Sequence, residues 1–410
     1  MSLTRSRTSI LLIIVLYLFI YNPIPRWPGV GFGLFLTILA FIYSLVRFDV
    51  YKRYTRYYSE ELKLSLFMIP YVLVIILLNG ESDIHVVPEL VSWILFSTCI
   101  PVFLIRVLIV KQKGFIFWDA ILLVGFIASL FSCVALFVPS FNDFLRAIQL
   151  ELEGGETENQ LDFRFYGLAI NLSSGYGYVQ GLLASLSLLL LDRRHLRYAV
   201  YFITLTLSVL VNARTGIFPI VITVIYLIGK SIVKFKIGQF IKVLIGSFAA
   251  IYLVVLIINL LPNVKEFIDD FFDQLFMMFL AEDSNLGDSA YVDRFKLPGT
   301  IDGLIFGEGY SLYGLDNKWE ASDIGFVNQI FTGGLVFAGS LLLYEIIVYM
   351  KIMKRSKEYV FSTIFFLSML VFNYKGMNFY AGGAYIKLYM LYYFVLVHNQ
   401  ISVKNKIAIT

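Results

Sequence analysis

The chain has 410 residues, of which 59% are hydrophobic and only 15% are charged, and its mean hydropathy is +0.79. These values lie well outside the globular range and indicate an integral membrane protein. The formal net charge of +4 is spread over short loops without a long basic run, which excludes nucleic acid as the expected partner.

Twelve apolar stretches follow one another along the chain, and most approach the ~20 residues that cross a bilayer core. The sequence therefore predicts an all-α polytopic membrane protein with about twelve transmembrane helices, forming a single integral membrane domain over residues 1–410. The stretches cover residues 9–22, 29–46, 64–79, 90–110, 116–140, 167–191, 198–212, 215–229, 241–262, 326–350, 359–373 and 383–397.

Charge alternates between the loops. The loops after the even-numbered stretches, together with both termini, hold 23 of the 33 Lys and Arg residues, whereas the opposite loops hold 22 of the 29 acids. The positive-inside rule then predicts that both termini are cytoplasmic. Arg5 and Arg7 precede the first stretch, and residues 24–28 offer no small-residue cleavage site, so we expect an uncleaved first helix.

Two predicted extracytoplasmic loops are unusually long, over residues 139–166 and 262–325, and loops of this length are often functional. The second begins with residues 265–280, where phenylalanines recur at helical spacing opposite three aspartates. This pattern predicts an amphipathic helix on the outer membrane face. Such a helix either shapes a lateral entrance for a lipid-linked substrate or only caps the bundle.

Three arginines, Arg164, Arg214 and Arg294, fall on the translocated side near the ends of apolar stretches, where each needs an anion or a wet cavity. Arg214 belongs to a predicted turn, Asn212-Ala213-Arg214-Thr215-Gly216, at the start of a helix. A guanidinium and the first backbone N–H groups of a helix both suit phosphate oxygens. The alternative for Arg214 is an interface anchor or a partner for an acid.

Three motifs occur in order along the second half of the chain. Arg164 is followed after ten residues by Gly175, the Asn212–Gly216 turn comes next, and Phe306-Gly307-Glu308-Gly309 is followed by Ser322-Asp323-Ile324-Gly325 and Gly333-Gly334. Together these resemble the Arg-x10-Gly, Ser-Arg-Thr-Gly-like and Gly-x-Gly…Ser-Asp-x-Gly segments of Wzy-type O-antigen and polysaccharide polymerases. The resemblance covers residues 164–343, and Arg294 does not reproduce the Arg-x10-Gly spacing.

The resemblance implies a GT-C-like fold and glycosyl transfer at the periplasmic face of a bacterial inner membrane. The donor would be an undecaprenyl-diphosphate-linked oligosaccharide, the acceptor a sugar hydroxyl on a second lipid-linked repeat unit, and the further partners membrane lipid, a chain-length regulator and a flippase. No cofactor is implied. The residues expected to bind substrate are Arg164, Arg214, Arg294, Gly175, Thr215 and Tyr310.

Two carboxylates and one cation are the candidate catalytic groups. Asp323 and Glu308 are placed to act as a general base on the acceptor hydroxyl, and Arg214 to stabilise charge on the leaving diphosphate. Structural readings remain open for both acids, since Ser322 or Asp323 suits a helix N-cap and Glu308 sits between two glycines. The acidic pairs in the loops do not form a metal cluster, so we expect metal-independent chemistry.

Three other functions fit parts of the sequence. An O-antigen ligase is expected to carry a loop histidine, but His85, His195 and His398 all lie outside the large loop. A glycosyltransferase using a polyprenyl-phosphate sugar tends to have an acid in its first outer loop, and residues 22–28 contain none. A transporter or flippase would use charges in mid-membrane, for which Glu345 and Lys387 are the candidates, but inverted repeats are missing.

Overall fold

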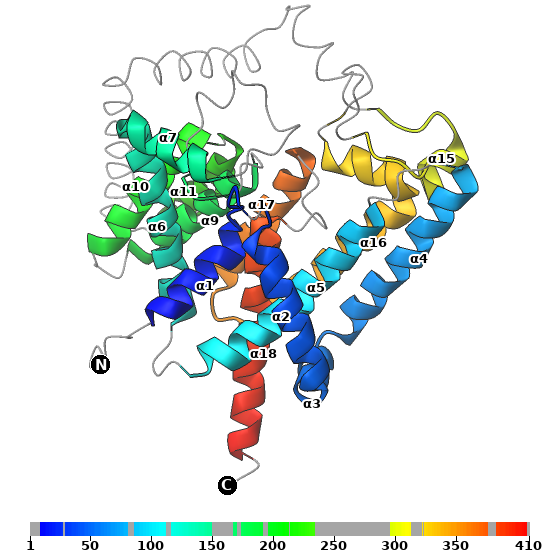
Figure 1. The fold of residues 1–410 in the computed structure, drawn as a ribbon, viewed down its shortest axis with the longest axis horizontal. Helices are drawn as coiled ribbons and strands as arrows, with labels where there is room; N and C mark the ends of the chain where they lie inside the picture. Colours follow the sequence, from blue (N-terminus) through cyan, green and yellow to red (C-terminus); the bar gives the residue numbers. More distant parts are fainter. Residues whose placement is uncertain are drawn as a thin grey trace, which may run out of the picture. The chain divides into compact units, whose positions relative to one another are not determined.

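A computed structural model covers the chain. It describes residues 9–27, 29–80, 86–111, 116–149, 167–169, 174–191, 196–212, 214–233, 296–312, 322, 324–375 and 383–407. These residues are mainly helical, and no β-strand occurs among them (Figure 1). The chain divides into two compact units, Met1–Val124 with Arg294–Thr410 and Gly125–Asp293.

The first unit contains the helices from the two ends of the chain. They are α1 (Ile10–Tyr21), α2 (Phe32–Val46), α3 (Phe48–Thr55), α4 (Ser59–Asn79), α5 (Val86–Leu104) with the π-helical turn η1 (Ile105–Ile109), the beginning of α6 (Phe117–Phe137), α15 (Ile301–Phe306), α16 (Gly325–Arg355), α17 (Tyr359–Lys375) and α18 (Ala384–Ile407).

Local sequence accounts for several helix ends. The Ser9 hydroxyl accepts a hydrogen bond from the Leu12 N–H at 3.2 Å and caps α1. Asn22 ends α1 in the left-handed conformation, and its Oδ1 accepts from the Gly33 N–H in the first turn of α2. One asparagine thus ends α1 and positions the start of α2. Gly80 ends α4 with a φ of 69°, which glycine adopts without steric cost.

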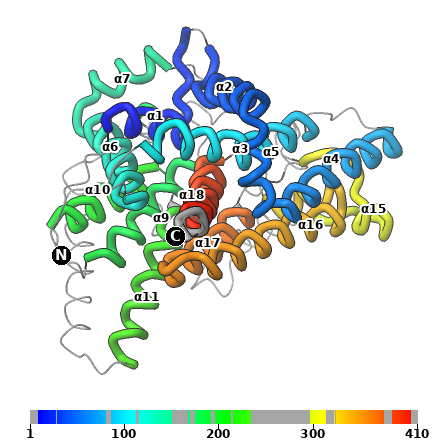
Figure 2. Tube along the Cα trace, turned by 90° about the horizontal axis from the view of Figure 1, so that it is seen from below, coloured from blue at the N-terminus to red at the C-terminus, as the bar shows by residue number. Residues whose placement is uncertain are grey.

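Helices α4 and α16 lie side by side with α15 at one end of the pair (Figure 1). Helix α17 runs along α16 (Figure 2). Aromatic rings join α17 to α18, since Phe365 and Tyr389 have their ring centres 4.9 Å apart. The core of this unit is therefore rich in buried aromatic side chains.

The second unit contains the remainder of α6, then α7 (Pro139–Ile148), α9 (Ser174–Leu190), α10 (Leu196–Asn212), the 3-10 turn η3 (Arg214–Gly216) and α11 (Ile217–Val233). Hydrogen bonds between small polar side chains join its helices. Ser129 of α6 donates to the Gln180 side chain of α9 at 3.2 Å, and Tyr176 of α9 donates to the Ala128 carbonyl at 3.1 Å. Such contacts suit helices packed away from water.

Eleven of the twelve predicted apolar stretches coincide with described helices, and the stretch at 241–262 lies outside the described residues. Among the described residues, four helical spans are long and apolar enough to cross a membrane: α4, α5 with η1, α6 and α16. Helices α2 and α3 add a fifth if they count as one bent span. The chain therefore fits an all-α, multi-pass membrane protein, while five further apolar helices are shorter, at 10–17 residues.

The structure also differs from the expected element boundaries. The predicted basic loop after residue 46 contains α3, which is bent by 99° from α2. The predicted loop at 139–166 opens with α7, and the predicted loop at 262–325 contains α15. Helices of 6 to 10 residues lack the long apolar run on which hydropathy depends.

Gly181 and Gly216 allow α9 to approach η3 and the start of α11. A Cβ at Gly216 would collide with the Gly177 carbonyl oxygen, and one at Gly181 would collide with the Gly216 carbonyl oxygen. Both obstacles are backbone atoms, which cannot rotate away. The sequence Gly177-x-x-x-Gly181 thus provides the close backbone contact that small residues give in membrane helix pairs.

We expect Gly216→Ala to lower the apparent melting temperature by several degrees, because the new methyl group forces the two backbones apart. Gly229→Ala in α11, the helix that follows η3, is the matched control, since its Cβ would meet nothing within 4 Å. A thiol-reactive dye can report unfolding through Cys99, which is buried, and Cys133, which is half-buried. Equal melting temperatures for the two variants would contradict the close contact.

Candidate functional site

A cleft of about 610 Å³ lies in the first unit where the C-terminal end of α4 meets the segment around α15. We call it the acidic cleft because Asp302 and Glu308 both line it and no Lys or Arg is among the described residues that do so. The remaining lining residues are Ile75, Leu78, Asn79, Thr300, Gly303, Phe306, Gly307 and Tyr310. An apolar wall on α4 thus faces a polar wall on the segment 300–310.

Two glycines fix the loop that carries Glu308. Gly307 and Gly309 have φ values of 91° and 84°, which other residues rarely adopt. A Cβ on Gly307 would come within 2.5 Å of the Gly333 Cα, and one on Gly309 within 3.0 Å of the Ile76 Cα. The loop is therefore held between α16 and α4, and the Gly-x-Gly pattern has a structural cause.

Helix α16 breaks where this loop meets it. Gly333 and Gly334 have non-helical backbone angles, and Gly334 has a φ of 68°. The Phe331 carbonyl, just before the break, accepts hydrogen bonds from the N–H groups of Glu308 at 2.7 Å and Gly309 at 3.1 Å. The Tyr71 hydroxyl of α4 donates to the Gly333 carbonyl at 3.0 Å. The Glu308 loop and α4 thus donate hydrogen bonds to the Phe331 and Gly333 carbonyl groups at the break in α16.

Glu308 is half-buried, and a hydrogen bond from Tyr310 orients its carboxylate. The Tyr310 hydroxyl donates a hydrogen bond to the Glu308 Oε2 at 2.9 Å, and the Tyr310 ring packs on Phe331 with their centres 5.6 Å apart. Glu308 Oε1 lies 3.1 Å from the position that a Cβ on Gly303 would take. A carboxylate presented in this way can accept a hydrogen bond or a proton from a sugar hydroxyl in the cleft.

The structure describes part of the Ser-Asp-x-Gly segment at the start of α16. The Ser322 hydroxyl accepts from the Ile324 N–H at 3.2 Å, and the Asn328 side-chain amide donates to the Ser322 carbonyl at 2.8 Å. Ile324 occupies the N-cap position, for which the sequence offered Ser322 or Asp323. Asp323 itself lies outside the described residues.

The predicted anion-binding turn forms η3 in the second unit. Asn212, which precedes it, is buried and donates from its side-chain amide to the Ser132 hydroxyl and the Ser208 carbonyl, both at 2.8 Å. Thr215 is half-buried, and Gly216 packs on Gly177 of α9. The structure thus brings η3 against the first turns of the helix that begins beside Gly175.

Several expected site features lie outside what the structure describes. Arg164, Arg294, Asp323 and the predicted amphipathic segment 265–280 are not among the described residues, and the side chain of Arg214 is not described either. The structure therefore brings together Glu308 with Tyr310 in the first unit. In the second unit it brings Thr215 and Gly216 beside α9.

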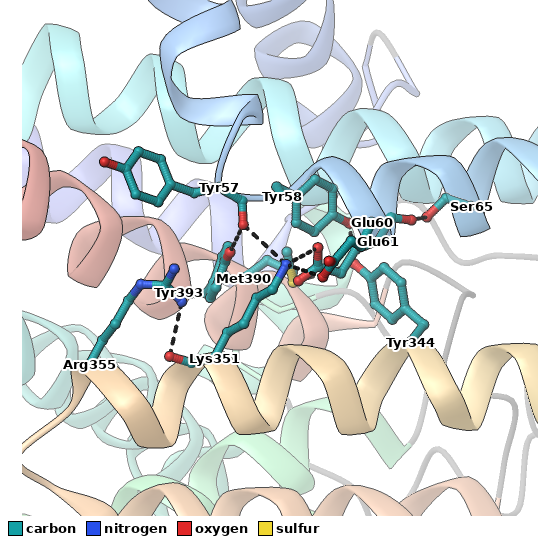
Figure 3. A network of polar contacts seen from close by, with 10 residues as sticks. All are labelled: Tyr57, Tyr58, Glu60, Glu61, Ser65, Tyr344, Lys351, Arg355, Met390 and Tyr393. Atoms are coloured by element: carbon teal, nitrogen blue, oxygen red, sulfur yellow. Dashed lines mark hydrogen bonds and ion pairs between the residues drawn. The ribbon is translucent and has the colours of Figure 1, made fainter.

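A polar network at the opposite ends of α4 and α16 was missed by the sequence analysis (Figure 3). The Lys351 ammonium lies 2.7 Å from Glu61, whose side chain is fully buried, and 3.0 Å from Glu60, which is exposed. It also donates to the Tyr57 carbonyl at 3.3 Å. The hydropathy pattern assigned Lys351 to a loop, whereas α16 continues to Arg355.

Tyrosines and one arginine extend this network. The Tyr58 and Tyr344 hydroxyls share a short hydrogen bond, and the Tyr393 hydroxyl donates to the Tyr57 carbonyl at 2.6 Å. Arg355 donates to the Gln400 side chain at 2.9 Å and lies over the Tyr393 ring. The sequence feature that would have indicated this network is the pair of adjacent acids, Glu60 and Glu61, directly before an apolar run.

Two further charged residues are buried deep within the first unit. Glu345 of α16 is fully buried, and within the described part of the chain neither of its carboxyl oxygens has a hydrogen-bond partner. Lys387 of α18 is 4% exposed, and its ammonium lies 4.8 Å from the centre of the Phe96 ring. The described residues contain no group of three or more His, Cys, Asp or Glu side chains arranged to hold a metal ion.

We expect Lys351→Met to destabilise the protein by about 3 kcal/mol, because it leaves the buried Glu61 carboxylate without its cation. Lys354→Met on the exposed side of α16 is the control and should be nearly neutral. Adding Glu61→Gln to Lys351→Met should recover part of the loss. Thermal unfolding of the purified protein in detergent measures all three, and equal stability of Lys351→Met and Lys354→Met would rule out a structural role for the pair.

Comparison of the chain with protein-family models, with curated proteins and with solved structures finds no match. The family resemblance therefore depends on the motifs alone. Two segments of the third motif, Gly307-Glu308-Gly309 and Gly333-Gly334, meet beside the acidic cleft.

Proposed function

We propose that this protein is a bacterial polysaccharide polymerase that transfers an undecaprenyl-diphosphate-linked glycan onto a sugar hydroxyl of another lipid-linked repeat unit. The main structural support is the Glu308 carboxylate, which a glycine-held loop presents to a cleft of about 610 Å³ at the ends of α4 and α15. The order of the three motifs along the chain supports the same reaction class.

In the proposed reaction the acceptor hydroxyl oxygen attacks C1 of the donor sugar while the bond from C1 to the diphosphate breaks. Glu308 or Asp323 takes the hydroxyl proton, and the undecaprenyl diphosphate leaves with the bonding electron pair. Tyr310 orients the Glu308 carboxylate through its 2.9 Å hydrogen bond. Arg214, with Arg164 and Arg294, balances the charge that develops on the diphosphate, which needs fixed cations in a water-poor site.

The proposed topology has twelve transmembrane helices in a GT-C-like arrangement, cytoplasmic termini and a periplasmic active site in the inner membrane. The charge distribution of the first unit supports this orientation. Asp302 and Glu308 line the cleft at one end of α4, whereas Lys351 and Arg355 lie at the opposite end of α16, near the start of α4. The positive-inside rule assigns that second end to the cytoplasm.

A lipid-linked oligosaccharide transporter is the second candidate, and Glu345 is the observation in its favour. A fully buried carboxyl group with two unpartnered oxygens is costly, and such residues in membrane helices often mark ion or proton pathways. Product length separates the two functions, because only a polymerase converts lipid-linked repeats in detergent solution into a ladder of longer glycans.

We expect Arg214→Ala and Arg164→Ala to abolish the glycan ladder at near-normal protein abundance. Arg214→Lys should restore little activity, because an ammonium cannot form the paired hydrogen bonds of a guanidinium. Gel analysis of lipid-linked products from cells that carry each variant provides the measurement. Arg26→Ala, in a predicted outer loop without a motif, is the control. Wild-type ladders from both Arg164→Ala and Arg214→Ala would exclude arginine stabilisation of the diphosphate.

We expect the carboxylate that acts as the base to lose about 10² to 10⁴ in turnover when it becomes an amide. Glu308→Gln and Asp323→Asn therefore distinguish the two candidates in purified protein supplied with synthetic lipid-linked repeats. Tyr310→Phe should cause a smaller loss if Glu308 is the base, because it removes only the orienting hydrogen bond. Asp49→Asn, at the opposite end of the unit, serves as the control. Full activity of both amide variants would refute a carboxylate base at these positions.

A further inference from the structure

Helix α3 differs from its neighbours in direction and in composition. It is bent by 99° from the apolar α2, so it runs roughly along the membrane plane if α2 crosses the bilayer. Its sequence includes Lys52 and Arg53, both exposed. A basic helix that lies in this plane is suited to the headgroup region of an anionic membrane.

A small cavity of about 40 Å³ lies between α3, η1 and the end of α18. Arg53 and Tyr54 line it from α3, Arg106 from η1, and His398 and Ser402 from α18. A water molecule needs roughly 10–15 Å³ of such space, so the cavity has room for about three waters or for one tetrahedral oxyanion group. Val50 and Ile401 complete the lining, so the cavity combines two guanidiniums and three other polar side chains with an apolar wall and room for a small anion.

The hydrogen bonds around the cavity fix its uncharged side chains. The Tyr54 hydroxyl and the His398 Nδ1 lie 2.8 Å apart, and the Ser402 hydroxyl lies 3.2 Å from the His398 Nε2. The Tyr54 and His398 rings stack with an interplanar angle of 10°. Both imidazole nitrogens therefore have partners within the protein, and the ring forms a rigid wall.

The two guanidiniums of this cavity lack acidic partners. Across the described ranges, no carboxylate lies within 4.0 Å of Arg53 or Arg106, whereas the neighbouring Arg47 pairs with Asp49 and Lys351 pairs with two glutamates. The charge of Arg106 acts on both the Tyr54 hydroxyl and the His398 ring. Two guanidiniums that have no acidic partner among the described residues, and that line the same small cavity, are arranged to bind phosphate oxygens.

Large apolar side chains flank these residues in the sequence and are exposed. Val46 and Phe48 adjoin the bend between α2 and α3, and Val110 follows η1 one turn after Arg106. A free phosphate ion would gain nothing from such surfaces, whereas acyl chains attached to the phosphate would cover them. The neighbourhood therefore favours an amphiphilic ligand.

We propose that Arg53, Arg106 and the Tyr54–His398–Ser402 cluster form a binding site for the phosphate group of an anionic membrane phospholipid. The basic end of the unit contains this site, so the charge rule assigns it to the cytoplasmic leaflet. It lies apart from the acidic cleft and does not depend on the polymerase reaction. The lipid would join α3, η1 and α18 at a position where their own side chains leave two positive charges unpaired.

The test uses purified full-length protein in a neutral detergent at about 0.3 M salt, which weakens attraction between charges at a distance more than direct contact between a guanidinium and a phosphate. Native mass spectrometry counts bound phosphatidylglycerol, and thermal shift gives its apparent affinity. We expect one tightly bound lipid, and weakening by about 25-fold in Arg53→Gln with Arg106→Gln, or about five-fold for each arginine. Arg53→Lys should also weaken binding, because it keeps the charge but loses the guanidinium fork.

Lys52→Gln with Arg56→Gln is the matched control, since both residues are exposed near Arg53 and neither lines the cavity. It should bind within about two-fold of the wild type under screening salt. If the double arginine variant fails to fold, Arg53→Gln alone serves, because Arg53 is exposed. Unchanged binding by the arginine variants, or an equal loss in the control, would overturn the site. Inorganic phosphate binding as tightly as the lipid would overturn the lipid assignment in favour of a free anion.

Discussion

A break in a membrane helix leaves backbone groups that must find partners inside the protein, and this constraint shapes the first unit. Helix α16 breaks at Gly333–Gly334, and the segment around Glu308 fills the break. Two N–H groups of the segment bind the Phe331 carbonyl, and the Tyr71 hydroxyl binds the Gly333 carbonyl. The acidic cleft exists because the loop is held against this break.

In the second unit the membrane constrains how helices attract one another, and the helices respond by packing closely. Helix pairs in lipid gain little from the hydrophobic effect, so small residues and interhelical hydrogen bonds supply the contact. Gly181 and Gly216 lack the side chains that would separate α9 from η3 and the start of α11. Asn212 and Ser132 then join α10 to α6. The turn with Arg214 is thus positioned by backbone packing.

Hydropathy predicted helix positions well, because a run of apolar residues is a local property of the chain. It could not predict the bend at Arg47, since α3 is short and polar, or the break at Gly333, which requires a contact from a distant loop. It placed Lys351 in a loop, because hydropathy treats a lysine as a loop residue and does not include its pairing with the buried Glu61. For the site, the glycines around Glu308 were visible in the sequence, but their contacts with Ile76 and Gly333 depend on tertiary structure.

The first unit is discontinuous in sequence, since residues 125–293 interrupt it. Glu61 and its partner Lys351 are 290 positions apart. At the usual ~5–20 residues per second of synthesis, the acid is made roughly 15–60 s before the lysine. During that interval the Glu61 carboxylate has no Lys351 to pair with, so α4 cannot adopt its final burial. Assembly of this unit must therefore wait for the last third of the chain, and a nascent protein stopped before α16 would expose the polar end of α4 to chaperones and proteases.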